Sequence, residues 1–337
     1  MPDTDCGVVN YIRKIFPGVL RYTCGRYSRD DIANCQTVVD QDLTDSGLDI
    51  DHLKNSVVVL DFLAEGHDPV VIAPLIEYLA GLVGIDSIRV LFNAVIDPEP
   101  LPYRARSFAT HFTTWDGRFI NTGDQSQVQL EQKFLCPARR PTPGRAQFIS
   151  QLLAVVPDVR ASFGSGFPEW SLEFQSYFSN HQLPILIDGD ARHYVHNQAS
   201  DVFRACLFNI IVETSSQTDP NSWSSVFITE KTFKSFDLYQ IPIWFAVPGT
   251  VAQVRQLGFD LFDDLIDHSY DTVTDPVERT NLILQQVAKI NDQYSLSGCQ
   301  RLRTTVWHRL QANYARLDQL SQEYSQTHDR LVAELTA

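Results

Sequence analysis

Three short segments decide the fold of this chain, and they read FNIIVET at residues 208–214, VFITEKTFK at 226–234 and IPIWF at 241–245. The first and third are apolar runs of strand length, typical of strands that are buried in a parallel sheet. The middle segment has the pattern of a helix start, with Thr229 as N-cap. The stretch therefore predicts a buried strand that closes on Glu213, followed by a loop, a helix and a second strand.

Glu213, Glu230 and Lys231 fall where the strand end and the helix start meet in this arrangement. In an open α/β sheet, ligands bind at this edge because unpaired amides and the helix dipole favour anions there. Capping alone explains Thr229 and Glu230, since acidic residues are common in first helical turns. A lysine in the first turn opposes the dipole, so we expect an anionic ligand to hold Lys231.

A basic loop at residues 138–144, ARRPTPG, precedes a second helix that is predicted at 145–155. Arginine suits a diphosphate, because its planar guanidinium stays charged and donates two parallel hydrogen bonds. Arg145 has the better position, since a helix N-terminus would reinforce its charge, and Arg140 is the second candidate. A solvated surface loop is the alternative interpretation.

These segments resemble the donor-binding core of the family 10 glycosyltransferases, the α1,3/4-fucosyltransferases, and related sugar transferases of bacteria and large viruses. The resemblance covers roughly residues 134 to 270 and consists of a strand closing on Glu, an aromatic-x-Thr-Glu-Lys helix start and a Pro-containing strand followed by Gly. The matching residues are Glu213, Phe227, Thr229, Glu230, Lys231, Pro242 and Gly249. Residues 145–148 are similar to the family's Arg-x-x-Phe helix start, whose Arg grips the donor diphosphate. The family usually has Tyr where this chain has Phe227.

The resemblance implies an α/β fold of the GT-B type, in which two Rossmann-like domains face each other across a cleft. It implies a glycosyltransferase that moves a sugar from a nucleotide-sugar, with a GDP-sugar such as GDP-fucose favoured, to a glycan or other hydroxyl acceptor. Transfer would be inverting and would need neither a divalent metal nor another cofactor, because basic side chains stabilise the leaving diphosphate. Glu213 would accept hydrogen bonds from sugar or ribose hydroxyls. The implied donor-binding residues are Arg140, Arg145, Glu213, Phe227, Thr229, Glu230 and Lys231.

The N-terminal half predicts a βαβ unit, with strands at residues 56–62 and 87–96 and a helix at 69–84 between them. The loop that follows the first strand would emerge at the edge of the sheet where ligands bind. This loop carries Glu65 and His67, which we expect to supply the general base that takes the proton of the acceptor hydroxyl. An ordinary surface loop is the alternative interpretation.

The length of 337 residues suggests two domains, since a domain averages about 150 residues. We place an acceptor-side domain at 1–130, a donor-binding domain at 131–298 and a C-terminal amphipathic helix at 299–337. Residues 97–130 are rich in Pro and Gly and are interpreted as acceptor-facing loops. A short helix is predicted at 8–15.

The C-terminal helix is predicted from apolar side chains that recur at helical spacing on one face. These side chains are Trp307, Leu310, Tyr314, Leu317 and Tyr324. Packing of this face on a domain is the simpler interpretation. A short heptad seam that forms an oligomer is the alternative, although Ser321 and His328 interrupt it.

The composition excludes several classes of protein. A formal net charge of −14 without a long basic run argues against a nucleic-acid-binding protein. The six cysteines form no CxxC pair, so neither a zinc motif nor a disulfide framework is indicated. The acidic start differs from a signal peptide, and no apolar run reaches the roughly 18 to 20 residues that span a bilayer. Animal members of the family that the chain resembles are tethered in the Golgi membrane, so we expect a cytoplasmic enzyme of microbial or viral type.

The main competing pattern is Asp188-Gly189-Asp190. It resembles the Asp-x-Asp with which a different transferase fold binds a divalent cation, and His193 and His196 lie near it in the sequence. Asp-Gly-Asp is also an ordinary turn, and we interpret it as one, so no metal site is predicted. A metal-dependent transferase and a catalytically silent nucleotide-sugar-binding module are the two alternative functions.

Overall fold

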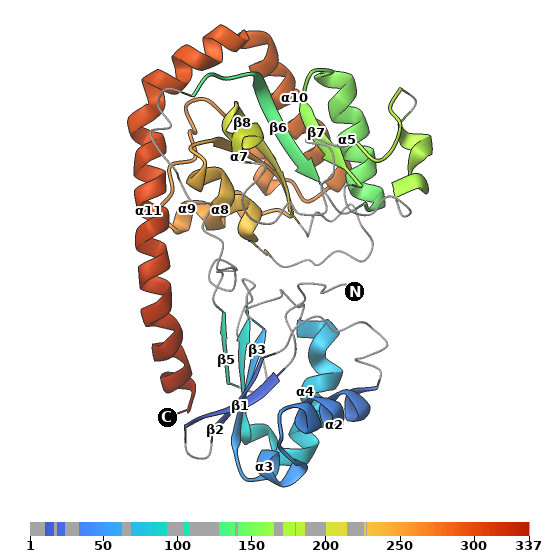
Figure 1. Ribbon diagram of the computed structural model, residues 1–337, viewed down its shortest axis with the longest axis vertical. Coiled ribbons are helices and arrows are strands. Elements are labelled where there is room, and N and C mark those ends of the chain that lie inside the picture. Colours follow the sequence, from blue (N-terminus) through green and yellow to red (C-terminus); the bar gives the residue numbers. More distant parts are fainter. Residues whose placement is uncertain are drawn as a thin grey trace. The chain divides into compact units, whose positions relative to one another are not determined.

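A computed structural model describes most of the chain, and the structural statements below concern only the residues that it describes. These are residues 11–16, 19–23, 34–62, 69–92, 104–107, 128–138, 141–164, 171–178, 180–185, 200–213, 226 and 228–336. The chain divides into two compact units (Figure 1). Unit 1 comprises Met1–Thr114 and Gln322–Ala337, and unit 2 comprises Trp115–Ser321. The domain limits predicted from the sequence stay predictions.

Unit 1 is built on a sheet of five described strands whose order follows the sequence. Its strands are β1 (Tyr11–Phe16), β2 (Val19–Thr23), β3 (Val57–Phe62), β4 (Ile88–Phe92) and β5 (Arg104–Ser107). The first two are antiparallel, and β2 to β5 run parallel. The predicted strands that begin near residues 56 and 87 are confirmed as β3 and β4.

One sequence prediction in unit 1 is wrong, and another is incomplete. The helix that we expected at 8–15 is contradicted by β1, which forms an antiparallel pair with β2. Tyr, Ile and Phe side chains are common in strands. The strand that pairs with this segment lies beyond residues 8–15, so the spacing of apolar residues within that segment could not reveal the pairing. The expected loops at 97–130 include β5, whose short sequence RARS shows no apolar alternation and is held in the sheet by backbone pairing with β4.

Three helices pack against this sheet and form the core of unit 1. They are α2 (Cys35–Asp45), α3 (Ile50–Lys54) and α4 (Pro69–Val83). The predicted helix at 69–84 is confirmed as α4, and its first residue is a proline, which has no amide hydrogen to leave unpaired. The buried side chains of this core include Leu20, Val39, Leu43, Leu53, Val58, Leu60, Leu75, Leu79, Ile88 and Val90.

Unit 2 contains a parallel sheet with the strand order β7-β6-β8-β9. Its strands are β6 (Gln132–Ala138), β7 (Arg160–Phe163), β8 (Cys206–Val212) and β9 (Ile241–Phe245), and the last two confirm the strands predicted in the segments 208–214 and 241–245. The chain moves from β6 outward to β7 on one side and from β8 outward to β9 on the other. The carboxyl ends of β6 and β8 therefore flank a topological switch point, where open α/β sheets bind ligands.

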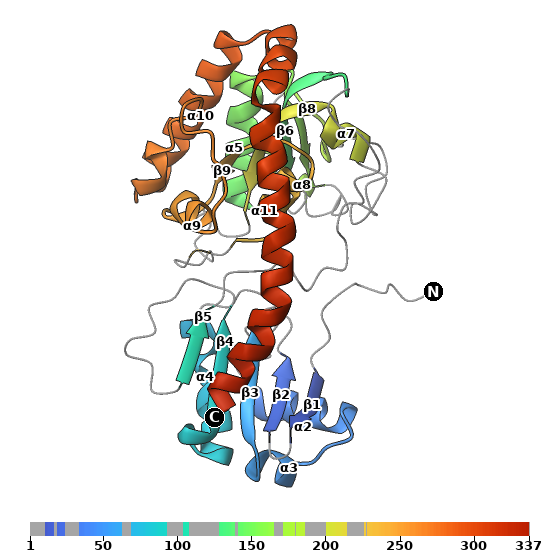
Figure 2. The same ribbon diagram turned by 90° about the vertical axis from the view of Figure 1, so that its left-hand side faces the viewer.

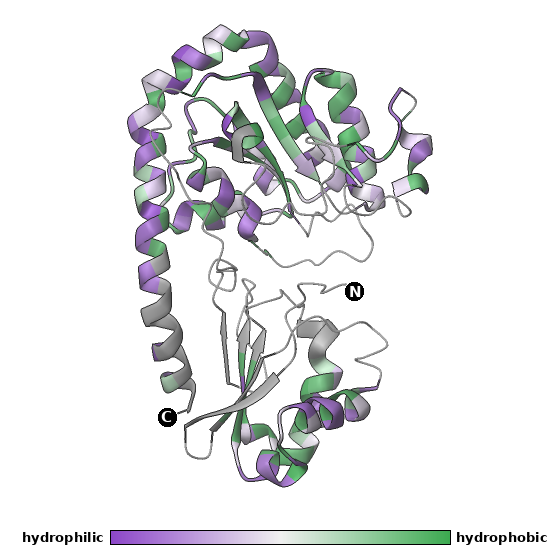
Figure 3. Ribbon diagram, in the orientation of Figure 1, coloured by the Kyte–Doolittle hydropathy of each residue, from purple (hydrophilic) through white to green (hydrophobic). Residues whose placement is uncertain are grey.

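Helices α5 (Pro143–Val155) and α8 (Glu230–Asp237) cover opposite faces of this sheet. Phe245 stacks on Phe148 of α5 with ring centroids 4.0 Å apart, whereas the adjacent Trp244 donates a hydrogen bond to Thr232 of α8. Neighbouring side chains of a strand point to opposite faces, so the two contacts assign one helix to each face. Burial on both sides explains the continuous apolar runs of β8 and β9, which Figure 3 shows in the hydropathy colours.

The last helices are α9 (Thr250–Gln256), α10 (Pro276–Gln293) and α11 (Leu296–Thr336). Figure 2 shows α11 as one long helix, and the ring of Tyr239 stacks between Trp307 and Tyr314 on it. None of the helices in the described ranges is both long and apolar enough to cross a membrane.

The start of α9 is capped by a side chain that is distant in the sequence. Asp271 accepts the backbone N–H of Val251 at 3.0 Å and that of Ala252 at 2.9 Å, one on each carboxylate oxygen. The N-cap Gly249 has a positive φ of 84°, a conformation in which glycine avoids the strain of a side chain. Its own amide donates to the carbonyl of Asp271 at 2.9 Å, so one residue satisfies three amides at this helix start.

Candidate anion-binding site at the switch point of unit 2

Two helix starts meet at the carboxyl ends of β6 and β8. Thr142 is the N-cap of α5, which begins two residues earlier than predicted because Pro143 fits the first helical position. Thr229 is the N-cap of α8, as predicted, and accepts a hydrogen bond from the backbone of Lys231. Glu213 directly follows β8, so all three residues lie at the switch point.

The carboxylate of Glu213 fastens the start of α8 to the end of β8. The residue is fully buried, at 0% relative exposure. Its Oε1 accepts the backbone N–H of Thr229 at 3.2 Å and the hydroxyl of Thr232 at 2.8 Å, and its Oε2 accepts the hydroxyl of Thr229 at 2.5 Å. These contacts are all within the protein, and the predicted contact with hydroxyls of a ligand stays a prediction.

Arg145 reaches the same residue from the other helix. It occupies the first turn of α5, its side chain is buried, and its Nη2 donates to the backbone carbonyl of Glu213 at 3.0 Å. Its positive charge is felt by Cys136 on β6, where it partly opposes the burial that raises the pKa of the thiol. The guanidinium is therefore held against the end of β8 rather than in a surface loop.

Lys231 and Glu230 form the part of the site that solvent reaches, with 26% and 33% of their side chains exposed. The ammonium of Lys231 lies 3.1 Å from Thr229 Oγ1, 3.8 Å from Glu213 Oε2 and 3.7 Å from Glu230 Oε1. The lysine thus sits in the first turn of α8, where the dipole disfavours a cation, and acidic side chains beside it offset that cost. Arg145 and Lys231 both contact Glu213 and together place two positive charges at the switch point.

Several residues that the sequence singled out lie outside the described ranges. Among the predicted donor-binding residues these are Arg140 and Phe227, and among the predicted catalytic residues they are Glu65 and His67. The competing metal pattern at 188–190, with His193 and His196, is also outside. In the described part of the chain, no three His, Cys, Asp or Glu side chains are grouped so that they would hold a metal ion.

The sequence did not reveal the roles of Thr232 and Trp244. Thr232 is the third residue of α8 and bonds to Glu213, and Trp244 donates its indole N–H to the Thr232 hydroxyl at 2.9 Å. Trp244 was interpreted only as an apolar residue of a buried strand. The one signal that was available is chemical, because a buried indole N–H needs an acceptor.

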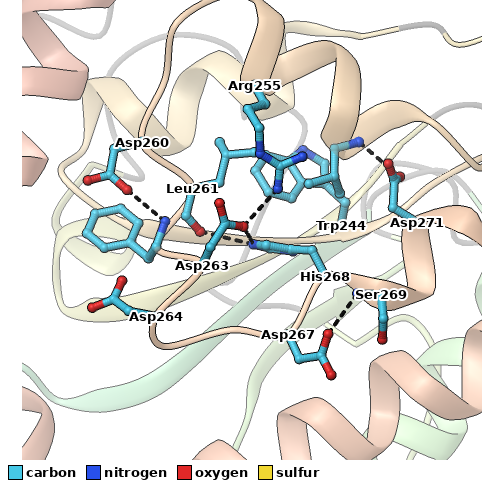
Figure 4. Close-up of polar contacts among 12 residues, drawn as sticks. Trp244, Arg255, Asp260, Leu261, Asp263, Asp264, Asp267, His268, Ser269 and Asp271 are labelled. Atoms are coloured by element: carbon cyan, nitrogen blue, oxygen red, sulfur yellow. Dashed lines mark hydrogen bonds and ion pairs between the residues drawn. The ribbon is translucent and has the colours of Figure 1, made fainter.

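A second buried polar network lies next to Trp244 (Figure 4). His268 is buried, with Nε2 at 3.0 Å from the carbonyl of Leu261 and Nδ1 at 2.9 Å from the hydroxyl of Tyr270. The Tyr270 hydroxyl in turn accepts the backbone N–H of Trp244 at 3.3 Å. Burial is the main cause that lowers the pKa of His268 below its usual 6.5, and Asp263, at 3.9 Å, opposes that shift. The ring is therefore a neutral part of the core.

We expect this histidine to make unit 2 less stable in mild acid. Its pKa is lowered in the folded state, so below about pH 6.5 the unfolded chain binds a proton that the folded chain does not. The stabilisation is complete above that pH and is lost as the pH falls from 6.5 towards the lowered pKa. Thermal unfolding between pH 8 and pH 5 measures the loss, with His268→Gln as a non-titrating comparison. A variant that loses stability as steeply as the wild type over this range would show that other groups cause it.

No family model matches this chain, and a search of curated proteins gives no match. Among solved structures, it is similar to a pneumococcal O-GlcNAc transferase, GtfA, in complex with UDP and GlcNAc, with 11% identity, a TM-score of 0.46 and 91% of this chain covered. This chain spans 59% of the length of that structure. It is also similar to the DNA-modifying enzyme β-glucosyltransferase, with 9% identity, a TM-score of 0.34, and 92% of this chain and 98% of that chain covered. A third similar structure is a mutant of the T4 phage enzyme BGT in complex with UDP-glucose. Its identity to this chain is 11% and its TM-score is 0.32, with 82% of this chain and 75% of that chain covered.

Proposed function

We propose that unit 2 binds the diphosphate of a nucleotide-sugar at the switch point between β6 and β8, and that the protein is a glycosyltransferase of the GT-B type. The observation that carries the proposal is the meeting of Arg145 and Lys231 at Glu213. The two cations come from the separate helix starts that follow the adjacent parallel strands β6 and β8. Helix starts at such a point favour anions through the dipole and the unpaired amides.

The arrangement suits a diphosphate leaving group. Positive side chains that are already fixed before reaction stabilise the negative charge that develops on the departing phosphate without reorganising. Arg145 is fixed by its bond to the Glu213 carbonyl, and Lys231 by Thr229 and the two carboxylates near it. Glu230 is partly exposed beside Lys231 and can accept hydrogen bonds from ribose or sugar hydroxyls.

The finer assignments rest on the resemblance to family 10 alone. They are a GDP-sugar such as GDP-fucose as donor, inversion at the anomeric carbon, and transfer without a divalent metal. The assignment of Glu65, with His67, as the base that takes the proton of the acceptor hydroxyl rests on their position after β3 in the sequence. A glycan or another hydroxyl compound is the proposed acceptor.

A thermal-shift panel of GDP-, UDP-, dTDP- and CMP-sugars tests the proposal. A ligand that binds only the folded state stabilises it by about 2.7 kcal/mol at one hundred times its dissociation constant, so one of the GDP-, UDP- and dTDP-sugar classes, which carry a diphosphate, is expected to raise the melting temperature clearly. The shift is expected to persist after dialysis against EDTA, because Arg145 and Lys231 supply the positive charge. A folded protein that responds to no member of the panel contradicts the proposal. A shift that EDTA abolishes and manganese restores favours the metal-dependent alternative at residues 188–190.

A further inference from the structure

The hydroxyl of Thr232 is held between two buried side chains. It donates to Glu213 Oε1 at 2.8 Å and receives the indole N–H of Trp244 at 2.9 Å. All three residues are almost inaccessible to water, with relative exposures of 0% for Glu213, 0% for Thr232 and 1% for Trp244. Trp244 therefore connects the carboxyl end of β9 to the residue on which Arg145 and Lys231 meet.

The direction of each hydrogen bond follows from the chemistry of the groups. An indole N–H only donates, so the Thr232 oxygen accepts from Trp244, and its single hydrogen is left for Glu213. Glu213 Oε1 also accepts the backbone N–H of Thr229, which can only donate. At Oε2 the Thr229 hydroxyl is likewise directed to Glu213, because its other neighbours are the backbone N–H and the ammonium of Lys231. Both oxygens of the carboxylate thus have fixed donors.

The position of Trp244 is fixed by contacts of both its backbone and its indole ring. The backbone N–H of Trp244 donates to the Tyr270 hydroxyl at 3.3 Å, and the imidazole of His268 packs with its ring centroid 5.8 Å away. Ile211 of β8 is its partner in the parallel register, one residue before Val212 and two before Glu213. The tryptophan is therefore a rigid reference point from which the hydroxyl of Thr232 and the carboxylate of Glu213 take their positions.

We propose that Trp244 is a positioning residue for the phosphate-binding cations, an inference that rests on the proposed function. Its N–H orients the Thr232 hydroxyl, and that hydroxyl orients the carboxylate of Glu213. The carboxylate in turn fixes the positions of the Thr229 hydroxyl and of the Lys231 ammonium beside it. Arg145 is set by the backbone carbonyl of the same Glu213. Trp244 does not contact the ligand in this scheme, and its effect on affinity is transmitted through Thr232.

Isothermal titration with GDP, UDP and dTDP, on variants of the full chain, tests this role. Trp244→Phe keeps an aromatic ring and removes the N–H, and Thr232→Val keeps the shape and removes the hydroxyl. Each is expected to weaken nucleotide binding about tenfold, the scale of one lost hydrogen bond in a buried network. The double variant is expected to be no weaker than either single variant, because both interrupt the same connection. Thr232→Ser restores the hydroxyl and is expected to bind within about twofold of the wild type.

Ile243→Val is the matched control for a general loss of packing, because Ile243 precedes Trp244 on β9 and faces the other side of the sheet. The role of Trp244 is refuted if Trp244→Phe and Thr232→Val bind as well as this control, or if Thr232→Ser is as weak as Thr232→Val. The comparison of Thr232→Val with Thr232→Ser decides the matter alone if Trp244→Phe does not fold. A wild-type protein that binds none of GDP, UDP and dTDP overturns the proposed function and this role together, whereas tight binding by every variant overturns this role only.

Discussion

Lys231→Met is expected to weaken the binding of GDP or UDP by about 10-fold to 100-fold, since a hydrogen bond to a charged group contributes roughly 1.5 to 3 kcal/mol. Methionine preserves most of the side-chain length and removes the ammonium that lies 3.1 Å from Thr229 Oγ1. Lys234→Met is the matched control, because Lys234 lies one turn later on the same helix and places its ammonium over the ring of Phe203. Isothermal titration of the two variants measures the difference. Equal losses would mean that the overall charge of α8, rather than this lysine, attracts the nucleotide.

The same titration on Arg145→Ala is expected to give a loss of similar size. Its control is Arg160→Ala, because Arg160 begins β7 and therefore lies at the amino edge of the same parallel sheet, away from the switch point. Arg145 is buried, so circular dichroism and a thermal melt are needed to show that the variant is folded. Wild-type affinity in a folded Arg145→Ala protein would remove the guanidinium from the proposed site.

Glu213→Gln is expected to destabilise unit 2 by about 3 kcal/mol and to abolish measurable nucleotide binding, which makes it the most damaging single change at the site. An amide replaces one acceptor oxygen by an NH2 donor. At Oε1 this donor would meet the backbone N–H of Thr229, and at Oε2 it would meet a hydroxyl whose other neighbour is the ammonium of Lys231. Either orientation brings donors together around a side chain that is fully buried, so the start of α8 is expected to be released from β8.

Urea denaturation followed by tryptophan fluorescence measures the loss of stability in Glu213→Gln. Glu131→Gln is the control, since Glu131 is an exposed carboxylate that pairs with Arg160 just before β6, and exposed pairs are worth about 1 kcal/mol or less. A Glu213→Gln protein that is as stable as Glu131→Gln would show that the carboxylate does not hold α8 in place.

The sheet of unit 2 could be predicted because its strands are buried on both faces. Residues 206–212 and 241–245 are almost wholly apolar, and the Thr at 229 marks the helix start between them by local chemistry alone. The strands β1 and β5 of unit 1 escaped prediction because pairing partners, rather than their own sequence pattern, decide their conformation. Strand pairing is a long-range contact that a local window does not contain.

The candidate site could also be predicted only in part. Glu213 and Lys231 were placed together because helix starts and strand ends of one parallel sheet share an edge, and Arg145 was added to them by the resemblance of residues 145–148. The burial of Glu213 was not foreseen, since a strand end is equally compatible with a carboxylate that faces solvent and one that faces the next helix. The hydrogen bond from Trp244 to Thr232 forms only if α8 packs on the face of β9 to which Trp244 points. That face depends on the packing of the helix against the sheet, which the local sequence does not specify.

The carboxylate at the start of α9 bears on ligand selectivity. The carboxylate of Asp271 already pairs with the amides to which an anionic ligand would bind at this helix start. Because it belongs to the same chain, it is always present there. A phosphate that approaches this helix would have to displace it from two amides and would be repelled by its charge. α9 also follows a strand of the same parallel sheet, so without Asp271 its start would compete for the anion. If unit 2 binds a diphosphate as proposed, Asp271 makes the start of α9 a less favourable place for it than the helix starts beside Glu213.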